Sequence, residues 1–448
     1  MKHTPRGRKD ALRFFAFFII PILVLIASND ILLKRDAVAY YTFTELASRD
    51  DIELALVGSS VVFNNVNPEI VTEITGKETF NVSSAYLNLT GVQAATKLMY
   101  KHNRPEHVVL ILEQETLIDP KENIQAQQRM LPLIKDPGVA LSYLLDNCLL
   151  DGRIIDRLLM FRTQQISSIE DLRQRRLLER HPEEYYDRYI RSNTYGRYQG
   201  RGFTRIVEEL TMQRQMEYQT ILPESFDKQH GLREQTKKQL LRFKALCQAH
   251  GSDLLILMSP TLTVRALSHD GVAEKNIALA DFCREHEIPF VDFTLVKPDF
   301  MPRLDPYYFD WNHLNGEGAD RYSRALAQYL NLYFRGENTD HLFYPSVSAY
   351  LDSIDFITNS WITESLGSAQ DTYTAGCNRG KGITPQYRFA IKNEDGSMTP
   401  VRDYSADPTL CVPAGTYREK ALCVFAHDPS KPGDPPVFFE LTVPRNDY

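Results

Sequence analysis

The sequence predicts an α/β protein with a doubly wound parallel sheet, followed by a small β-rich domain. Short apolar strands alternate with helical stretches over residues 52–112 and again over 253–334. Strands that alternate with helices pair in parallel, with helices on both faces of the sheet. After about residue 336, Thr/Val alternation with Pro and Gly turns replaces this pattern. At 448 residues, the chain exceeds what one hydrophobic core usually organises, so we expect two folded units.

The first part of the pattern contains three strands and two helices. Ile52–Val57 is a short apolar run that predicts the first buried strand, and Thr79–Val82 predicts the second. His107–Leu112 is rich in β-branched residues and too short for a helix, so it predicts the third. These strands are connected by a helix over Pro68–Gly76, opened by the proline and closed by the glycine, and by a helix over Gly91–His102.

Residues 120–248 interrupt the alternation. The segment is charged, rich in Arg and Glu and helical in its period, so it predicts a helical insertion without strands. Its tyrosines interleave with arginines, which leaves two interpretations open. They form either an aromatic, cationic surface for a sugar polymer or membrane headgroups, or a solvated helix face whose rings pack against the body. The tyrosines are Tyr185, Tyr186, Tyr189, Tyr195 and Tyr198.

The α/β pattern resumes after the insertion and ends before the β-rich domain. We expect strands at Asp253–Met258 and Pro289–Phe293, with a helix around Ala273–Glu287 between them. A closing amphipathic helix is expected over Gly316–Phe334. Residues 336–448 then predict a small β-sandwich from their strand pattern and turn residues.

Composition excludes several classes of partner and cofactor. The formal net charge of −7 gives no basic field, so nucleic acid is not an expected partner. The six cysteines form no C-x-x-C motif, and we expect no metal site and no dinucleotide or other cofactor. A disulfide among Cys377, Cys411 and Cys423 stays open, since the sequence does not select a pair.

The start of the chain carries a membrane-targeting pattern. Five basic residues precede the apolar run Phe14–Ala27. Apolar helices of about 20 residues span a bilayer, and cationic flanks stay in the cytoplasm. We therefore expect residues 1–35 to be an uncleaved single-pass anchor, with the rest of the chain on the periplasmic or extracellular side. A signal peptide cleaved near Ile26–Ser28 is the alternative. The expected domains are this anchor, an α/β domain over 36–335 and the β-rich domain over 336–448.

Two polar clusters lie at the ends of predicted elements. Gly58-Ser59-Ser60 follows the first strand, at the carboxyl edge where open parallel sheets bind ligands. Asp310 and His313 precede the last helix. A carboxylate three residues before a histidine can hold one ring nitrogen while the other takes a proton from a serine. The alternative is that the serines form a helix N-cap and that Asp310 and His313 only cap and pack the last helix.

These clusters resemble the SGNH/GDSL hydrolase superfamily over about residues 50–335. The Gly-x-Ser turn of that family matches Gly58-Ser59-Ser60, which implies that Ser60 is the nucleophile. Its Asp-x-x-His block matches Asp310 and His313, which implies a Ser60/Asp310/His313 catalytic triad in a flavodoxin-like α/β domain.

The oxyanion-hole blocks of the family match less well. Asn81 fits the second block, but Ser83 stands where a glycine is expected, although its backbone amide can still serve. The third block is Gly-x-Asn, whereas this chain has Glu113–Glu115 after the third strand. The asparagine donor is therefore missing or replaced by Gln114, and loss of such a donor typically costs about 2.7–4 kcal/mol. The resemblance thus implies an oxyanion hole formed by the amides of Ser60 and Ser83, with Gln114.

The anchor, the Gly-Ser-Ser turn and the long insertion are similar to a membrane-anchored subgroup of this superfamily. That subgroup includes the D-alanyl-lipoteichoic acid transfer protein and polysaccharide O-acetylation proteins. The resemblance implies a serine esterase or O-acyltransferase that acts on acyl esters, with acetyl as the expected group, of a cell-envelope or extracellular polysaccharide. It also implies a membrane-bound O-acyltransferase as a partner. The alternative is a noncatalytic SGNH-fold subunit that binds glycan or assembles an envelope modification system.

Overall fold

The computed structural model describes residues 17, 24, 36–118, 130–151, 168–189, 195–208, 231–267, 272–310, 312–433 and 436–443. The predicted anchor over residues 1–35 therefore lies outside the described residues, apart from Phe17 and Val24, which are helical and exposed. None of the helices within the described ranges is long and apolar enough to cross a membrane. The chain divides into two compact units, one of residues 1–208 with 233–257 and one of residues 209–232 with 258–448.

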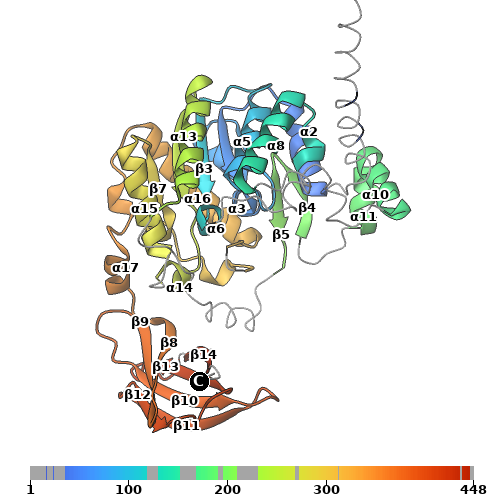
Figure 1. The fold of residues 1–448 in the computed structure, drawn as a ribbon. Helices are drawn as coiled ribbons and strands as arrows, with labels where there is room; N and C mark the ends of the chain where they lie inside the picture. The colour runs from blue at the N-terminus through green and yellow to red at the C-terminus, as the bar shows by residue number, and fades with distance from the viewer. Residues whose placement is uncertain are drawn as a thin grey trace, which may run out of the picture. The chain divides into compact units, whose positions relative to one another are not determined.

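A five-stranded parallel sheet, flanked by helices, forms the centre of the α/β part (Figure 1). Its strand order is β2-β1-β3-β6-β7, so strands that are consecutive in the chain are not always neighbours in the sheet. The predicted α/β class and the five expected parallel strands are confirmed. The strands are β1 (Leu54–Gly58), β2 (Thr79–Ser83), β3 (His107–Leu112), β6 (Asp253–Met258) and β7 (Phe290–Asp292).

Burial explains the apolar sequence of the central strand β1. Every residue of β1 and β2 is buried, and β1 pairs in parallel with β2 on one side and with β3 on the other. Parallel strands covered on both faces need apolar side chains at successive positions rather than in alternation, as in Leu54–Val57. The last residue of β1 is Gly58. A Cβ at this position would lie 2.5 Å from the carbonyl oxygen of Ile111 and 2.6 Å from Cγ2 of Val62, so only glycine fits there.

Several helices of the first unit begin or end at residues that cap them. α4 starts at Pro68 after Asn67, whose side chain caps the first turn, and it ends at Gly76 with a left-handed φ of 70°. α10 begins with a complete capping box between Ser168 and Asp171. The described helices are α2 (Ala37–Ser48), α3 (Ser60–Asn65), α4 (Pro68–Thr75), α5 (Leu89–Met99), α6 (Gln114–Ile118), η1 (Leu131–Leu133), α8 (Pro137–Asp151), α10 (Ile169–Arg180), α11 (Pro182–Tyr189) and α13 (Glu234–Ala249).

The prediction that residues 120–248 form no strand is wrong. β4 (Tyr195–Gly200) and β5 (Phe203–Ile206) form an antiparallel hairpin in this insertion, although its other described elements are helical. The turn Gly200-Arg201-Gly202 has φ values of 94°, 52° and 77°, which glycine adopts readily and an α-helix does not contain. In the sequence, these two glycines lie in a stretch dominated by arginines and tyrosines, whose pattern predicts helices and not a hairpin turn. Tyr198 consequently lies on a strand and not on the helix face that we considered.

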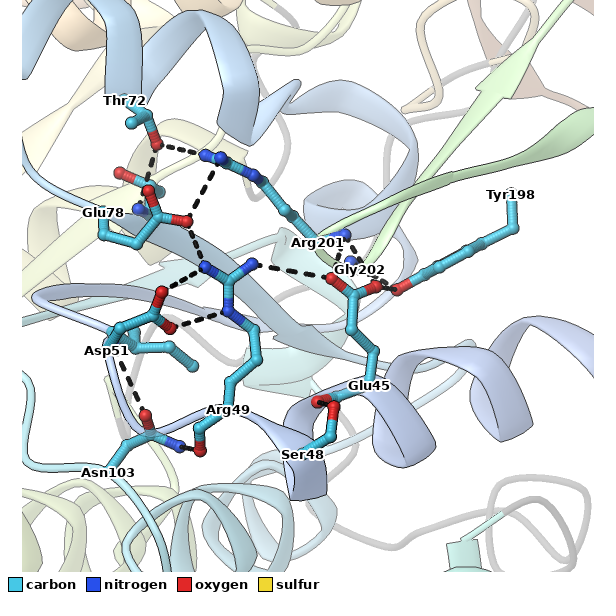
Figure 2. Close-up of polar contacts among 12 residues, drawn as sticks. Glu45, Ser48, Arg49, Asp51, Thr72, Glu78, Asn103, Tyr198, Arg201 and Gly202 are labelled. Carbon is cyan, nitrogen blue, oxygen red and sulfur yellow. Dashed lines mark hydrogen bonds and ion pairs between the residues drawn. The ribbon is translucent and has the colours of Figure 1, made fainter.

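The tip of this hairpin is fixed to the edge strand β2. The carbonyl of Arg201 accepts a hydrogen bond from Asn81 N at 2.9 Å. A Cβ on Gly202 would lie 2.1 Å from Asn81 O, so only glycine permits this approach. Glu45 of α2 accepts from Arg201 N at 2.9 Å and from the Tyr198 hydroxyl at 2.7 Å (Figure 2). The hairpin therefore covers part of an edge strand that would otherwise be open to pairing.

A second set of charges joins the same elements (Figure 2). Arg49, at the end of α2, makes a bidentate pair with Asp51, with both N···O distances at 2.8 Å. Arg49 also pairs with Glu78, and an oxygen of Glu78 lies 3.2 Å from a guanidinium nitrogen of Arg201. The hydrogen bond to Asp51 is the main cause of a raised pKa of Arg49, so this side chain stays charged. The network therefore ties α2 and the hairpin to the start of β2.

The second unit contains the last α/β elements and the C-terminal strands. α16 (Gly316–Phe334) has the predicted bounds of the closing helix. One face of α16 is buried, including Tyr322, Leu326 and Leu330, which repeat at helical spacing. The other helices of this unit are α14 (Thr263–Ala266), α15 (Val272–Glu285), η3 (Phe293–Leu295), η4 (Asp305–Tyr307), η5 (Asp340–Leu342) and α17 (Val347–Ser353).

The C-terminal strands form two antiparallel sheets that contribute to one hydrophobic core. Their orders are β11-β10-β13-β14 and β12-β9-β8. The core contains Tyr373 from one sheet and Phe389 and Val424 from the other. The strands are β8 (Ile357–Leu366), β9 (Gln370–Arg379), β10 (Gln386–Lys392), β11 (Met398–Ser405), β12 (Thr409–Pro413), β13 (Ala421–His427) and β14 (Val437–Thr442).

The cysteines of these strands are not bonded to one another. Cys377, Cys411 and Cys423 are all free thiols. Cys377 Sγ lies 3.4 Å from the Tyr387 hydroxyl, and burial raises the pKa of Cys423 to about 12. The two buried thiols therefore behave as small core residues.

Candidate active site

The predicted nucleophile turn connects β1 to α3. Ser59 is the N-cap residue of α3, and Ser60 is the first residue of this helix. Ser59 is buried, and its hydroxyl donates to the carboxylate of Glu113, which follows β3. Ser60 is partly exposed. The two serines therefore differ: Ser59 makes a buried structural contact, whereas Ser60 keeps access to solvent.

Asn81 holds the helix that carries Ser60. Its Nδ2 donates to the carbonyls of Val66 at 2.8 Å and Val62 at 3.2 Å. The last carbonyls of a helix have no partner within it, and α3 has only six residues. Because Asn81 N also donates to Arg201, one residue connects α3 to the hairpin. The resemblance aligns Asn81 with the second block of the family, but the sequence does not indicate that Asn81 connects α3 to the hairpin.

Several buried polar side-chain atoms lie at the ends of β2 and β3. Ser83 is the last residue of β2 and is paired with Gly58 of β1. The hydroxyls of Ser83 and Ser84 and the Nε2 of Gln114 are buried, and none has a hydrogen-bond partner among the residues that the structure describes. Proteins rarely leave buried donors unpaired, so such atoms point to a bound ligand or water. They flank the strand that ends at the predicted nucleophile turn.

Asp310 and His313 are brought together by a tight loop. Nδ1 of His313 lies 2.7 Å from Oδ2 of Asp310 and 2.9 Å from Oδ1. Oδ1 of Asp310 also accepts from the backbone amides of His313 at 2.8 Å and Asn312 at 3.1 Å. Phe309 N donates to the carbonyl of His313 at 2.7 Å and closes the loop. The carboxylate thus holds the ring at Nδ1, which assigns Nε2 to proton transfer in the predicted triad.

The charge state of Asp310 follows from the same contacts. Burial raises the pKa of this carboxyl group, but the hydrogen bond and charge of His313 and the two backbone amides outweigh it. The pKa of Asp310 therefore lies below its ordinary value. Asp310 is ionised at neutral pH, as an acceptor that orients a histidine must be.

The N-terminus of α16 is capped by a different residue. Asn315 is the N-cap, and its side chain accepts from Gly318 N at 3.0 Å. A Cβ on Gly318 would lie 2.7 Å from Cβ of Tyr307, so glycine permits close packing at this position. The cap of α16 is thus supplied by Asn315 rather than by Asp310 or His313.

The predicted site residues lie in both compact units. Ser60, Ser83 and Gln114 belong to the first, and Asp310 and His313 belong to the second. Within the described residues, no group of three or more His, Cys, Asp or Glu side chains is arranged to hold a metal ion. A scan against family models matches no family, and a search of curated proteins finds no match to this chain. The complete triad stays a prediction.

Proposed function

We propose that this chain is a membrane-anchored serine esterase or O-acyltransferase of the SGNH type. The observation that carries the proposal is the Asp310–His313 pair, in which an ionised carboxylate holds Nδ1 of the histidine. The strand order β2-β1-β3-β6-β7 supports it, because it is the order of flavodoxin-like sheets. Such sheets bind ligands where the strand order reverses, beyond the carboxyl ends of β1 and β3. Ser60 and Gln114 each lie two residues after the end of their strand, β1 and β3 respectively.

In the proposed reaction, Oγ of Ser60 attacks the carbonyl carbon of an ester while Nε2 of His313 takes the hydroxyl proton. The tetrahedral intermediate expels the alcohol, which receives that proton and leaves an acyl group on Ser60. Water then releases a free acid, or a sugar hydroxyl takes the acyl group, and Ser60 regains its proton through His313. Asp310 stays ionised throughout and stabilises the imidazolium.

The oxyanion of the intermediate requires donors that are already in position. We assign this role to the backbone amides of Ser60 and Ser83 and to Nε2 of Gln114. Nε2 of Gln114 is buried without a partner among the described residues, and this supports the assignment because a preorganised donor works best where water is excluded. Loss of one such donor typically lowers kcat by about 10²–10³.

The proposed substrate and location follow from the family resemblance and from the basic and apolar start of the chain. The substrate is an acyl ester, acetyl foremost, of a cell-envelope or extracellular polysaccharide. The catalytic part lies on the periplasmic or extracellular side. A membrane-bound O-acyltransferase is the proposed partner where the reaction is acyl transfer.

Labelling with a fluorophosphonate probe tests the proposal. The full-length wild-type protein and Ser59→Ala should be labelled, whereas Ser60→Ala and His313→Ala should not, because the probe needs an activated serine. Ser59→Ala is the matched control, since it removes the neighbouring hydroxyl at the same turn. A folded wild-type protein that takes no label would favour the noncatalytic alternative, a subunit that binds glycan or assembles the modification system.

A further inference from the structure

One face of the larger C-terminal sheet carries a row of aromatic rings with an arginine among them. Arg388, Phe425 and Phe438 are cross-strand neighbours on β10, β13 and β14. The Arg388 guanidinium lies 4.3 Å from the ring centre of Phe425, which lies 5.4 Å from that of Phe438. On the other side, Tyr404 of β11 lies 5.5 Å from the guanidinium, and His427 lies 5.5 Å from Tyr404. We call these five residues the aromatic row.

The row lies on the face opposite the hydrophobic core. Tyr387 and Phe389, which flank Arg388 along β10, belong to the core, and side chains alternate between the faces of a strand. All five members of the row are partly exposed. The pairing of β10 with β11 shifts register on both sides of Phe389, which places Tyr404 near Arg388. The row therefore presents rings to solvent across four adjacent strands.

The charge of Arg388 has no counterpart in the described part of the chain. Arg388 forms no ion pair there, and its Nε is buried without an acceptor. Lys392, on the same strand and face, is instead paired with Glu440 at 2.7 Å. Asp403, the nearest acidic neighbour of Tyr404 in sequence, is exposed and makes no ion pair with Arg388. A guanidinium held between rings without a carboxylate favours an anionic ligand, since Arg pairs with carboxylates through a planar fork.

We infer that the aromatic row is a noncatalytic binding surface for an acidic polysaccharide, a chain that carries uronate carboxylates. The partly exposed rings supply apolar surface against which sugar rings pack, and Arg388 supplies a charged hydrogen bond to a carboxylate. Strands about 4.8 Å apart place successive contacts along the row, which suits a linear polymer. The net charge of −7 opposes unspecific attraction of a polyanion, so binding must be local. No ester has to be cleaved, so the inference is independent of the proposed function.

Calorimetric titration of the full-length protein with polygalacturonate tests the inference, with the carboxyl-reduced polymer as the neutral probe. The wild-type protein and Ser60→Ala should bind polygalacturonate equally. Arg388→Gln should weaken binding about tenfold or more, the effect of losing one charged hydrogen bond. Phe438→Ala should weaken it as well, through lost stacking. Lys392→Gln is the matched control and should bind like the wild type, because it removes a neutralised charge from the same strand and face.

Several results would overturn the inference. Absence of wild-type binding, unchanged binding by Arg388→Gln, or equal binding of the carboxyl-reduced polymer would each exclude a uronate site. Equal losses in Arg388→Gln and Lys392→Gln would indicate diffuse charge attraction. Dimerisation in light scattering that disappears in Arg388→Gln would assign the face to a second copy of the chain. Circular dichroism of each variant shows whether the sheet is intact, and Arg388→Lys, which keeps the charge, should retain part of the affinity if the row binds a carboxylate.

Discussion

Replacing Asp310 with Asn tests the predicted triad while keeping the loop that forms it. The amide oxygen of Asn can still accept from the backbone amides of Asn312 and His313, now at 3.1 and 2.8 Å from Oδ1. The charged hydrogen bond from His313 Nδ1 to Oδ2, at 2.7 Å, is lost, and the contact of Nδ1 with Oδ1, at 2.9 Å, is left to an uncharged oxygen that already accepts from two backbone amides. An amide nitrogen at that place donates to Nδ1 and moves the ring proton to Nε2. That tautomer cannot take a proton from Ser60.

The structure predicts a small loss of stability and a large loss of turnover. A hydrogen bond to a charged group contributes about 1.5–3 kcal/mol, and solvent screens part of it because the side chains of His313 and Asp310 are 17% and 25% exposed. We expect a loss of about 1–2 kcal/mol from a typical stability of about 5–15 kcal/mol, so the variant stays folded. The same change in a serine protease triad lowers kcat by about 10⁴, and we expect a similar loss with little change in KM.

The assay measures kcat, KM and thermal unfolding on the same samples, with p-nitrophenyl acetate as substrate. The expected decrease in Tm is about 2–8 °C at neutral pH. Because the folded-state pKa of Asp310 is lowered, its stabilisation is present above the unfolded pKa of about 3.9 and is lost as the pH falls through the folded pKa. The stability difference between wild type and variant should therefore disappear in acid. A loss of activity that tracks the fraction of unfolded protein would refute the triad.

Three further predictions concern the nucleophile, the hairpin and the topology. Ser60→Ala should abolish ester hydrolysis, whereas Ser59→Ala should keep much of it. Ser59→Ala should also lower the free energy of unfolding by about 1–3 kcal/mol, because the buried carboxylate of Glu113 loses a donor. Equal losses of activity in the two variants would mean that the nucleophile is misassigned. Gly202→Ala should cost about 2–4 kcal/mol in urea unfolding, since its Cβ would overlap the backbone of β2 at a φ of 77°. Gly200→Ala is the control, with a φ of 94° but no atom within 4 Å of the new Cβ, and should cost less. A reporter fused after Tyr448 should be active only outside the cytoplasm, and cytoplasmic activity would contradict the anchor.

The parallel strands could be predicted because each is a contiguous apolar run bounded by turn residues. His107–Leu112 and Asp253–Met258 were predicted with the bounds that β3 and β6 have in the structure. The hairpin could not be predicted in this way, because its stability depends on contacts between distant parts of the chain. The hydrogen bond between Asn81 and Arg201 and the close approach of Gly202 arise only once β2 is in place. A local sequence window contains neither contact.

The candidate site shows the same difference between contacts that are local in the sequence and contacts between distant segments. Asp310 and His313 are three residues apart, so one loop is enough to join them, and the pair is predicted from this spacing together with the serine turn. The contact between Ser59 and Glu113 depends instead on the adjacent positions of β1 and β3. In the sequence, Glu113 stands beside the position where the resemblance expects an asparagine donor, which is either missing or replaced by Gln114. In the structure, its carboxylate holds the Ser59 hydroxyl and so restrains the turn that presents Ser60. Glu113 therefore makes a buried structural contact at the predicted nucleophile turn.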